Sequence, residues 1–184
     1  FKEHLINGAD PNSKILSRGG DEITLLYFIV ADIYHSYDSE YVELLLSYGA
    51  DVNVVNEYGT TCLMRAILVK NLKLIELFID SGAIINAKTT SGWTALHCAA
   101  HYLYGDQKKY LELLLSKGAD VNAIITTGPD RGHTPLDLAV GEIADTIRKN
   151  GGKTGIGMRA LMPRLVQHGR FAFSFVAKEG KVYE

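Results

Sequence analysis

Apolar residues recur along most of this chain at the spacing of short helices. Residues 111–115 and residues 72–79 are two such runs, and each has a broad apolar face. Gly118 and Gly82 follow these runs at positions suited to a left-handed helix end. A segment with small residues, 94–100, precedes the run at 111–115. We predict pairs of short helices, and such pairs bury their apolar faces only when other pairs stack on both sides.

Two short signals repeat along the chain. The first is a Gly-Ala-x-x-Asn turn, which together with the related Gly151-Gly152 recurs at intervals of 41, 33, 36 and 33 residues. The second is a Thr followed two residues later by Leu. The turn occurs at Gly8–Asn12, Gly49–Asn53, Gly82–Asn86 and Gly118–Asn122, and the threonine signal at Thr24, Thr61, Thr94 and Thr134. A period near 33 residues indicates stacked structural repeats.

The residues within each repeat resemble those of the ankyrin repeat family. Thr94-Ala95-Leu96-His97 and Thr134-Pro135-Leu136-Asp137 are similar to the family's Thr-Pro-Leu-His tetrapeptide, and Gly118–Asn122 matches its turn between repeats. The resemblance covers residues 1–152. It implies an all-α fold, an ankyrin-repeat solenoid of helix–turn–helix units with β-turn fingers.

The domain organisation that we expect is one repeat stack followed by a tail. The stack, residues 1–152, comprises a half repeat at 1–18 and repeats at about 19–55, 56–88, 89–128 and 129–152. Four extra residues between Asn12 and Thr24 predict a longer loop around residues 17–21, and the same excess precedes Thr134. Repeat five is short, so we expect both of its helices to be clipped. Small residues are expected where first helices approach most closely, at Ala66, Ala99 and Ala139.

Residues 153–184 leave this pattern. A short helix is expected over residues 158–167, and Phe171, Phe173 and Phe175 alternate with other residues as in a strand with one aromatic face. Residues 178–181 predict a turn that leads to residues 182–183 and completes a hairpin. We expect this tail to cover the open end of the stack, because solenoid ends need covering. The alternative is an arm that binds a partner.

The charge balance is nearly even. The chain has 19 basic and 21 acidic residues, a net charge of −2, and no run of Lys or Arg, so we expect no nucleic-acid partner and no membrane partner. The longest apolar run, residues 23–31, is too short to span a bilayer, and no secretory leader is visible. The two cysteines, Cys62 and Cys98, suit a reducing compartment. We therefore expect a cytoplasmic monomer, located in the host cytosol if the protein is a secreted effector.

Candidate chemical motifs are weak. His97 and His101 lie four residues apart, a spacing that can bind zinc, but no third ligand is evident nearby. Gly152-Lys153-Thr154 is similar to the end of a phosphate-binding loop, but Ile147 stands where that loop has its first Gly. Residues 169–173 faintly resemble an RNA-binding strand with its basic residue and Gly in inverted order. We expect no catalytic, cofactor-binding or metal-binding residues, and a protein that is not an enzyme.

The family resemblance implies a binding surface instead. Ankyrin stacks bind protein partners on the concave face made by turn tips and first helices, so we expect a non-enzymatic interaction scaffold. The family's variable positions fall on Glu57, Tyr58, Thr60, Leu68, Val69, Thr90, Ser91, Trp93, His101, Tyr102, Asp130, Arg131 and His133. Trp93 and Tyr58 are the expected anchors, because neither position is needed for stacking and aromatic residues dominate interfaces.

Two alternatives come from other classes of protein. In the first, these residues are the targeting module of a larger enzyme or bacterial effector. In the second, the chain is the substrate of an asparagine hydroxylase. Asn53 and Asn122 each follow a Leu by eight residues, Leu45 and Leu114, which resembles ankyrin sites used by an iron- and 2-oxoglutarate-dependent hydroxylase. That pattern is nearly built into any good repeat, so its specificity is poor.

Overall fold

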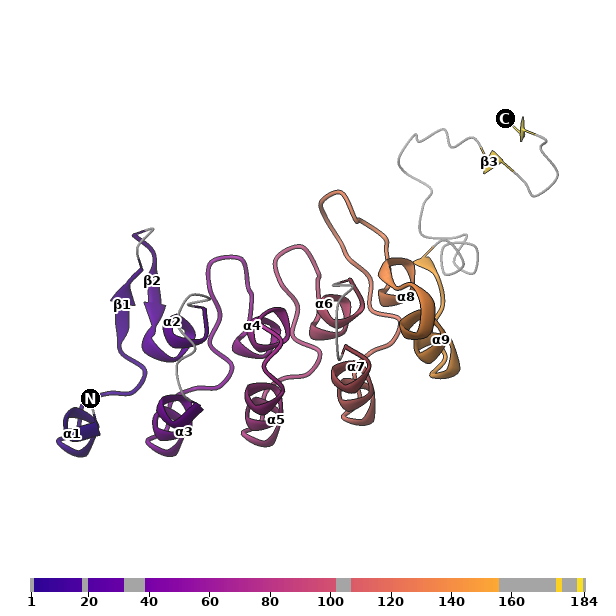
Figure 1. Ribbon diagram of the computed structural model, residues 1–184. Helices are drawn as coiled ribbons and strands as arrows, with labels where there is room; N and C mark the ends of the chain where they lie inside the picture. The colour runs from indigo at the N-terminus through magenta and orange to yellow at the C-terminus, as the bar shows by residue number, and fades with distance from the viewer. Residues whose placement is uncertain are drawn as a thin grey trace.

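Short helices alternate between two rows over most of the chain (Figure 1). The computed structural model describes residues 2–17, 20–31, 39–101, 107–155, 175–176 and 182–183. The first helices of the repeats are α2 (Leu25–Ala31), α4 (Cys62–Leu68), α6 (Ala95–His101) and α8 (Pro135–Leu138). The second helices are α1 (Lys2–Ile6), α3 (Ser39–Ser47), α5 (Leu72–Asp80), α7 (Gln107–Ser116) and α9 (Gly141–Lys149). The predicted all-α solenoid is confirmed.

Extended connections lead from each second helix to the next first helix and rise side by side (Figure 1). We call them the fingers of repeats two to five, residues 13–24, 54–61, 87–94 and 123–134. In the finger of repeat two, β1 (Lys14–Leu16) pairs antiparallel with β2 (Glu22–Thr24). In the finger of repeat five, the N–H of Ile125 donates to the carbonyl of His133 at 3.0 Å. Both four-residue insertions therefore lengthen fingers, and the first is the end of a strand pair rather than an isolated loop.

Side-chain caps and glycines set the helix ends. The Thr61 hydroxyl accepts the N–H of Met64 at 3.2 Å and begins α4, and the Asn71 side chain accepts the N–H of Leu74 at 3.1 Å and begins α5. Gly82 and Gly118 follow α5 and α7 with φ angles of 87° and 83°. These values confirm the predicted left-handed helix ends, a conformation that glycine adopts without strain.

The core runs along the stack between the two rows of helices. The largest of its fully buried side chains on the second helices are Leu45, Ile75, Phe78, Leu111, Leu114 and Ile147. Ala66 and Ala99 are also buried, in α4 and α6, where small side chains let neighbouring helices approach closely. Ala139 is different. It ends α8 in an extended conformation with ψ of 147° and is partly buried against the core, so it lies at the end of the first helix rather than within it.

Repeat five has one clipped helix rather than two. Its first helix, α8, has 4 residues, whereas α9 has 9, as many as α3 and α5. The backbone is extended at Ala139 and Val140, and α9 begins at Gly141. The missing residues therefore come from α8 and from its connection to α9, and the second row of helices keeps its full length.

An asparagine from each turn clamps the following repeat. The amide nitrogen of Asn86 donates to the carbonyl of Gly118 at 3.0 Å, while its oxygen accepts the N–H of Asp120 at 2.7 Å. The same pair of hydrogen bonds recurs three more times, from Asn12 to Gly49 and Asp51, from Asn53 to Gly82 and Ile84, and from Asn122 to Gly151 and Lys153. The asparagine of the turn signal thus makes a contact between repeats, in which its amide nitrogen donates one hydrogen bond and its amide oxygen accepts another.

His97 occupies the centre of the stack between repeats four and five. Its side chain is fully buried, and its Nδ1 accepts the N–H of Thr94 at 3.1 Å. Burial lowers the pKa of His97 to about 4, and the nearby carbonyls of His133 and Ala123 oppose that shift only in part. His97 thus has a structural role in the core rather than a role as a metal ligand.

Ion pairs connect successive second helices on their exposed sides. Glu43 of α3 lies 3.1 Å from Lys73 of α5, and Asp80 of α5 lies 3.7 Å from Lys117, just after α7. Lys108 of α7 pairs with Glu142 of α9. All these side chains are substantially solvent-exposed, so each pair adds only a small stabilisation that salt weakens.

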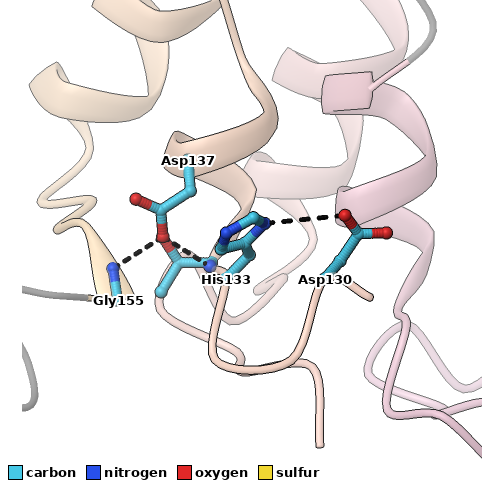
Figure 2. Close-up of polar contacts among 5 residues, drawn as sticks. Asp130, His133, Asp137 and Gly155 are labelled. Atoms are coloured by element: carbon cyan, nitrogen blue, oxygen red, sulfur yellow. Dashed lines mark hydrogen bonds and ion pairs between the residues drawn. The ribbon is translucent and has the colours of Figure 1, made fainter. Parts of the chain in front are cut away.

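The residues that follow α9, up to Gly155, fold back and contact repeat five. The hydroxyl of Thr134 donates to the carbonyl of Lys153 at 2.7 Å, and the N–H of Gly155 donates to Asp137 Oδ2 at 2.6 Å. Figure 2 shows Asp137 accepting that N–H. Gly152-Lys153-Thr154 therefore follows helix α9 and contacts the last repeat, rather than following a strand as in a phosphate-binding loop.

Little of the tail lies within the described residues. β3 (Phe175–Val176) pairs antiparallel with β4 (Val182–Tyr183), which agrees with the predicted hairpin. The helix expected over 158–167, and Phe171 and Phe173 of the expected aromatic face, fall outside the described residues. For the residues beyond Gly155, covering of the open end of the stack thus stays a prediction.

Replacing Asn86 with Ala should lower the free energy of unfolding by about 1–3 kcal/mol. The change removes two hydrogen bonds between repeats, and each such bond contributes about 0.5–1.5 kcal/mol. Urea unfolding followed by circular dichroism measures this loss. The control is Asn86→Asp, which keeps the acceptor for Asp120 N–H and should lose less. Equal stability of the Ala variant and the parent would show that the clamp does not hold the repeats together.

Stability should fall as the pH falls from 6.5 to 4, partly through His97. The unfolded histidine takes up a proton near pH 6.5, whereas the folded one stays neutral down to about pH 4. The unfolded state therefore binds more protons in this window, and up to about 3 kcal/mol is lost by its lower end. Urea unfolding at several pH values should give a flatter profile for His97→Gln than for the parent. Parallel profiles would contradict the burial of a neutral His97.

Candidate functional site

The fingers are joined to each other by backbone hydrogen bonds near their tips. The N–H of Thr90 donates to the carbonyl of Tyr58 at 2.9 Å, and the N–H of Thr126 donates to the carbonyl of Ser91 at 2.8 Å. A Cβ on Gly92 would lie 2.8 Å from Thr126 N, so this position requires glycine for the close approach of two fingers. The fingers of repeats three to five are thus a connected row rather than three independent loops.

A groove of about 400 Å³ opens between repeats three and four, on the face formed by the fingers and the first helices. Its walls are the two finger tips, and its floor comes from α4 and α6. The lining residues are Tyr58, Thr60, Met64, Leu68, Thr89, Thr90, Ser91, Trp93 and Cys98. None of these residues carries a formal charge at neutral pH.

Several of the polar groups in the groove are already hydrogen-bonded within the protein. Thr89 Oγ1 accepts the N–H of Trp93 at 3.0 Å and lies 3.0 Å from Ser91 Oγ. Thr90 Oγ1 donates to the carbonyl of Tyr58 at 3.2 Å. The remaining surface is mostly apolar and aromatic, from Met64, Leu68 and Trp93. The groove therefore suits an apolar side chain better than a charged one.

Trp93 has a structural reason for its position. The ring is partly buried and lies edge-on to His101 with centroids 5.4 Å apart, and 5.9 Å from the ring of His97. The prediction that Trp93 has no packing role is therefore wrong. Its ring contacts the helix behind it and also lines the groove, a combination that fixes the ring orientation before any ligand arrives.

Tyr58 matches its predicted exposure at a finger tip. Its side chain is 62% exposed, the largest value among the aromatic residues of the groove. The pKa of Tyr58 is raised first by a hydrogen bond to Glu57 and by the charge of that carboxylate, and further by the charge of Asp21. Tyr58 thus remains a neutral phenol with acidic residues of two neighbouring fingers nearby.

The structure brings together only part of the predicted site. Six of its residues line the groove, namely Tyr58, Thr60, Leu68, Thr90, Ser91 and Trp93. Glu57 lies exposed beside them, Val69 ends α4, and His101 ends α6 against Trp93. Tyr102 falls outside the described residues. Asp130, Arg131 and His133 lie apart from the groove, in the finger of repeat five.

Three lining residues were not predicted, namely Met64, Thr89 and Cys98. Met64 and Cys98 are almost fully buried, at 1% and 6% exposure, so their sequence positions indicate core rather than site. Met64 and Cys98 each lie about one helical turn from a variable surface position, Leu68 and His101 respectively, and this spacing is the signal that could have identified them.

The finger of repeat five carries a separate polar pair. His133 Nδ1 lies 3.7 Å from Asp130 Oδ1, and both side chains are partly exposed (Figure 2). The same figure shows that Asp137 faces Gly155 on the other side of this finger. The two carboxylates therefore serve different contacts, one on the finger and one at the end of the stack.

The candidate chemical motifs give no reactive centre in the part of the chain that the structure describes. No group of three or more His, Cys, Asp or Glu side chains suited to a metal ion occurs there. Burial raises the pKa of the Cys62 and Cys98 thiols to about 12, so both stay protonated at neutral pH. Both cysteines are free. Residues 169–173 of the RNA-like segment lie outside the described residues.

The two candidate hydroxylation sites are engaged in the stack. Asn53 donates to the carbonyl of Gly82 at 3.3 Å, and Asn122 donates to the carbonyl of Gly151 at 3.2 Å. Each side chain also accepts an N–H from the following repeat. An enzyme that modifies either amide therefore has to open a turn between repeats first.

A search for membrane-spanning helices among the described residues finds none that is long and apolar enough.

Comparisons with known proteins agree with this geometry. A family model described as ankyrin repeats (3 copies) matches residues 2–89 and again residues 28–125. Potassium channel AKT1 of Oryza sativa subsp. japonica is 39% identical over 57 residues, which are 31% of this chain and 6% of that protein. The RelA-associated inhibitor of Mus musculus is 42% identical over 50 residues, 27% of this chain and 6% of that protein.

A longer match involves a regulatory subunit. Protein phosphatase 1 regulatory subunit 27 of Mus musculus is 32% identical over 102 residues, which cover 52% of this chain and 58% of that protein. The chain thus spans 6% of the length of the first two relatives and 58% of the third. The similarity lies in the repeats that the family model describes, and this chain belongs to the ankyrin repeat family.

Proposed function

We propose that this protein-interaction module binds its partner on the face formed by the fingers and first helices, with the groove beside Trp93 as the central contact. The observation that carries the proposal is the groove itself. It brings six variable positions of the repeat together with a fixed aromatic ring, over about 400 Å³. Aromatic side chains in such pockets contribute most of the affinity at many protein interfaces.

The chemistry of the groove supports binding rather than catalysis. Of the titratable groups that line the groove, the Cys98 thiol stays protonated and Tyr58 stays a neutral phenol, and the nearby His97 is buried and neutral above about pH 4. None of these three groups is activated as a nucleophile or poised as a general base near neutral pH. The names of two relatives, an inhibitor and a regulatory subunit, also describe proteins that act on other proteins.

Tyr58 gives the cleanest test, because Trp93 also packs against α6. Tyr58→Ala should weaken binding of the partner at least tenfold, a change of about 1.4 kcal/mol, and leave the melting temperature almost unchanged because the side chain is 62% exposed. The matched control is Tyr48→Ala, which removes a 40% exposed tyrosine from the turn after α3.

The measurement uses three immobilised chains of residues 1–184, the parent and the two variants, in the same cell extract with quantitative mass spectrometry. Proteins retained by the parent and by Tyr48→Ala, but reduced at least tenfold on Tyr58→Ala, are the expected result. A set of proteins retained equally by all three chains would place the interface elsewhere.

A further inference from the structure

One position of the first helices changes its chemical character in repeat three. The residue four places after the threonine of each repeat is Phe28 in repeat two, Cys98 in repeat four and Leu138 in repeat five. In repeat three it is Arg65, the single Lys or Arg of the four described first helices, and this side chain is partly buried. The other repeats stack with an apolar residue at this position, so stacking does not require a charged one.

The guanidinium of Arg65 is only partly satisfied within the protein. Nη2 donates to the carbonyl of Ala31, at the end of α2, at 2.8 Å, and this is the one hydrogen bond of the side chain within the described chain. Nε is buried and has no hydrogen-bond partner. Nη1 also has no partner there but, unlike Nε, is not buried. One donor group of the fork is therefore fixed to the protein and another is accessible to a ligand.

No carboxylate of the described chain neutralises the charge of Arg65. The ion pairs of that part of the chain join other residues, and none of them includes this guanidinium. The Ala31 carbonyl offers only a partial negative charge, at the C-terminal end of a helix of 7 residues. A partly buried cation gives up hydration that such a contact does not replace, and an incoming carboxylate would supply the missing counter-charge.

Arg65 lies beside the groove on α4. It follows Met64 directly and precedes Leu68 by about one helical turn, and both of these residues line the groove. Residues three apart on a helix have Cβ atoms about 5–6 Å apart. The bond to Ala31 directs the guanidinium toward α2, whereas the groove lies between α4 and α6. Since α2, α4 and α6 stand in one row (Figure 1), a segment that crosses them meets the groove and Arg65 in succession.

We propose that Arg65 is a second contact for the partner and binds a carboxylate, so that the partner carries an aspartate or glutamate near the apolar side chain in the groove. The carboxylate accepts a hydrogen bond from Nη1, while the bond from Nη2 to Ala31 holds the guanidinium in place. An extended segment advances about 3.3 Å per residue, so the two partner side chains lie about two to four residues apart. This inference rests on the proposed function and adds the charge of the partner to it.

A phage-displayed library of random dodecapeptides, selected on the chain of residues 1–184, tests the pairing without a known partner. Selected sequences should place Asp or Glu within about four residues of a large apolar residue, about threefold more often than the input library. The chain has a net charge of −2, so non-specific attraction favours basic peptides and would not produce this preference. A selection without a preference for acidic residues would overturn the inference.

A double-mutant cycle with a selected synthetic peptide, measured by titration calorimetry, identifies the contact. Arg65→Leu, which introduces the residue type that repeat five has at this position, should weaken binding about tenfold, and so should exchange of the peptide's carboxylate for its amide. Both changes together should weaken binding little more than either alone. The control is Arg148→Leu, which removes an exposed cation from α9 and should leave affinity unchanged. Losses that simply add would overturn the inference.

A purely structural role for Arg65 gives a different result. If the side chain only caps α2, Arg65→Leu lowers the free energy of unfolding in urea while peptide affinity stays that of the parent, which would overturn the inference. Arg65→Lys serves as the second variant, because it keeps the positive charge with a different geometry. It should bind the peptide more tightly than Arg65→Leu does, and amide exchange in the peptide should still weaken its binding. Equal affinity of the two variants for the peptide would contradict a contact between charges.

The remaining outcomes separate this inference from the proposed function. If Tyr58→Ala weakens peptide binding but Arg65→Leu does not, the groove binds and the charge pairing fails. If only Arg65→Leu weakens it, the proposed groove contact fails while the carboxylate contact stands. Self-association of the parent that Arg65→Leu abolishes, measured by sedimentation, would assign the site to a second copy. A folded deletion of residues 157–184 with higher peptide affinity would assign it to the chain's own end. Either assignment would overturn the inference.

Discussion

The stack depends on one repeated contact, the asparagine side chain that bridges two turns. Each of these amides donates to one repeat-end carbonyl and accepts one backbone N–H, so neither a serine nor an aspartate can replace it fully. Because the donor and acceptor sit on one rigid amide, the contact fixes both the spacing and the rotation between neighbours. The apolar faces of the second helices supply most of the driving force for stacking. The amides determine how successive repeats are oriented.

The orientation of successive repeats also determines where the fingers lie and, through them, the position of the groove. With the turns held at one side of the stack, the finger tips of repeats three to five approach closely enough to exchange backbone hydrogen bonds. Thr90 and Tyr58 are joined in this way across repeats, and the groove lies directly beside them. Trp93 is held from behind by the rings of α6. A binding surface that is already ordered before contact loses little conformational entropy when a ligand arrives.

The sequence indicates the fold well, because the contacts that build it recur at one period. The glycine turns and the threonine that precedes each first helix follow from signals repeated along the chain. The errors arise where a residue's role depends on a neighbour in space. Trp93 looks like an exposed turn residue until α6 brings two histidine rings against it. Ala139 follows the alanine pattern in register but lies beyond a helix of only 4 residues.

The candidate site was partly predictable for the same reason. Variable positions identify the fingers and the rims of the first helices, and six of them meet in the groove. They do not identify its floor, since Met64 and Cys98 carry the apolar character of core residues and are nearly buried. Nor does the pattern show that Asp130 and His133 belong to a different part of the face. The depth of a groove depends on the packing between repeats, which the composition of a single repeat does not contain.

Asp137 occupies the position in repeat five that His97 occupies in repeat four. A buried imidazole at this position faces the carbonyls of the next finger, whereas the carboxylate of Asp137 accepts the N–H of Gly155. His97 therefore faces hydrogen-bond acceptors of the chain that follows it, whereas Asp137 contacts a hydrogen-bond donor. Engineers who wish to append a repeat after residue 152 would have to replace Asp137, because a carboxylate facing carbonyl oxygens would repel the incoming finger. A single side chain at position 137 thus disfavours a further finger at this end of the stack.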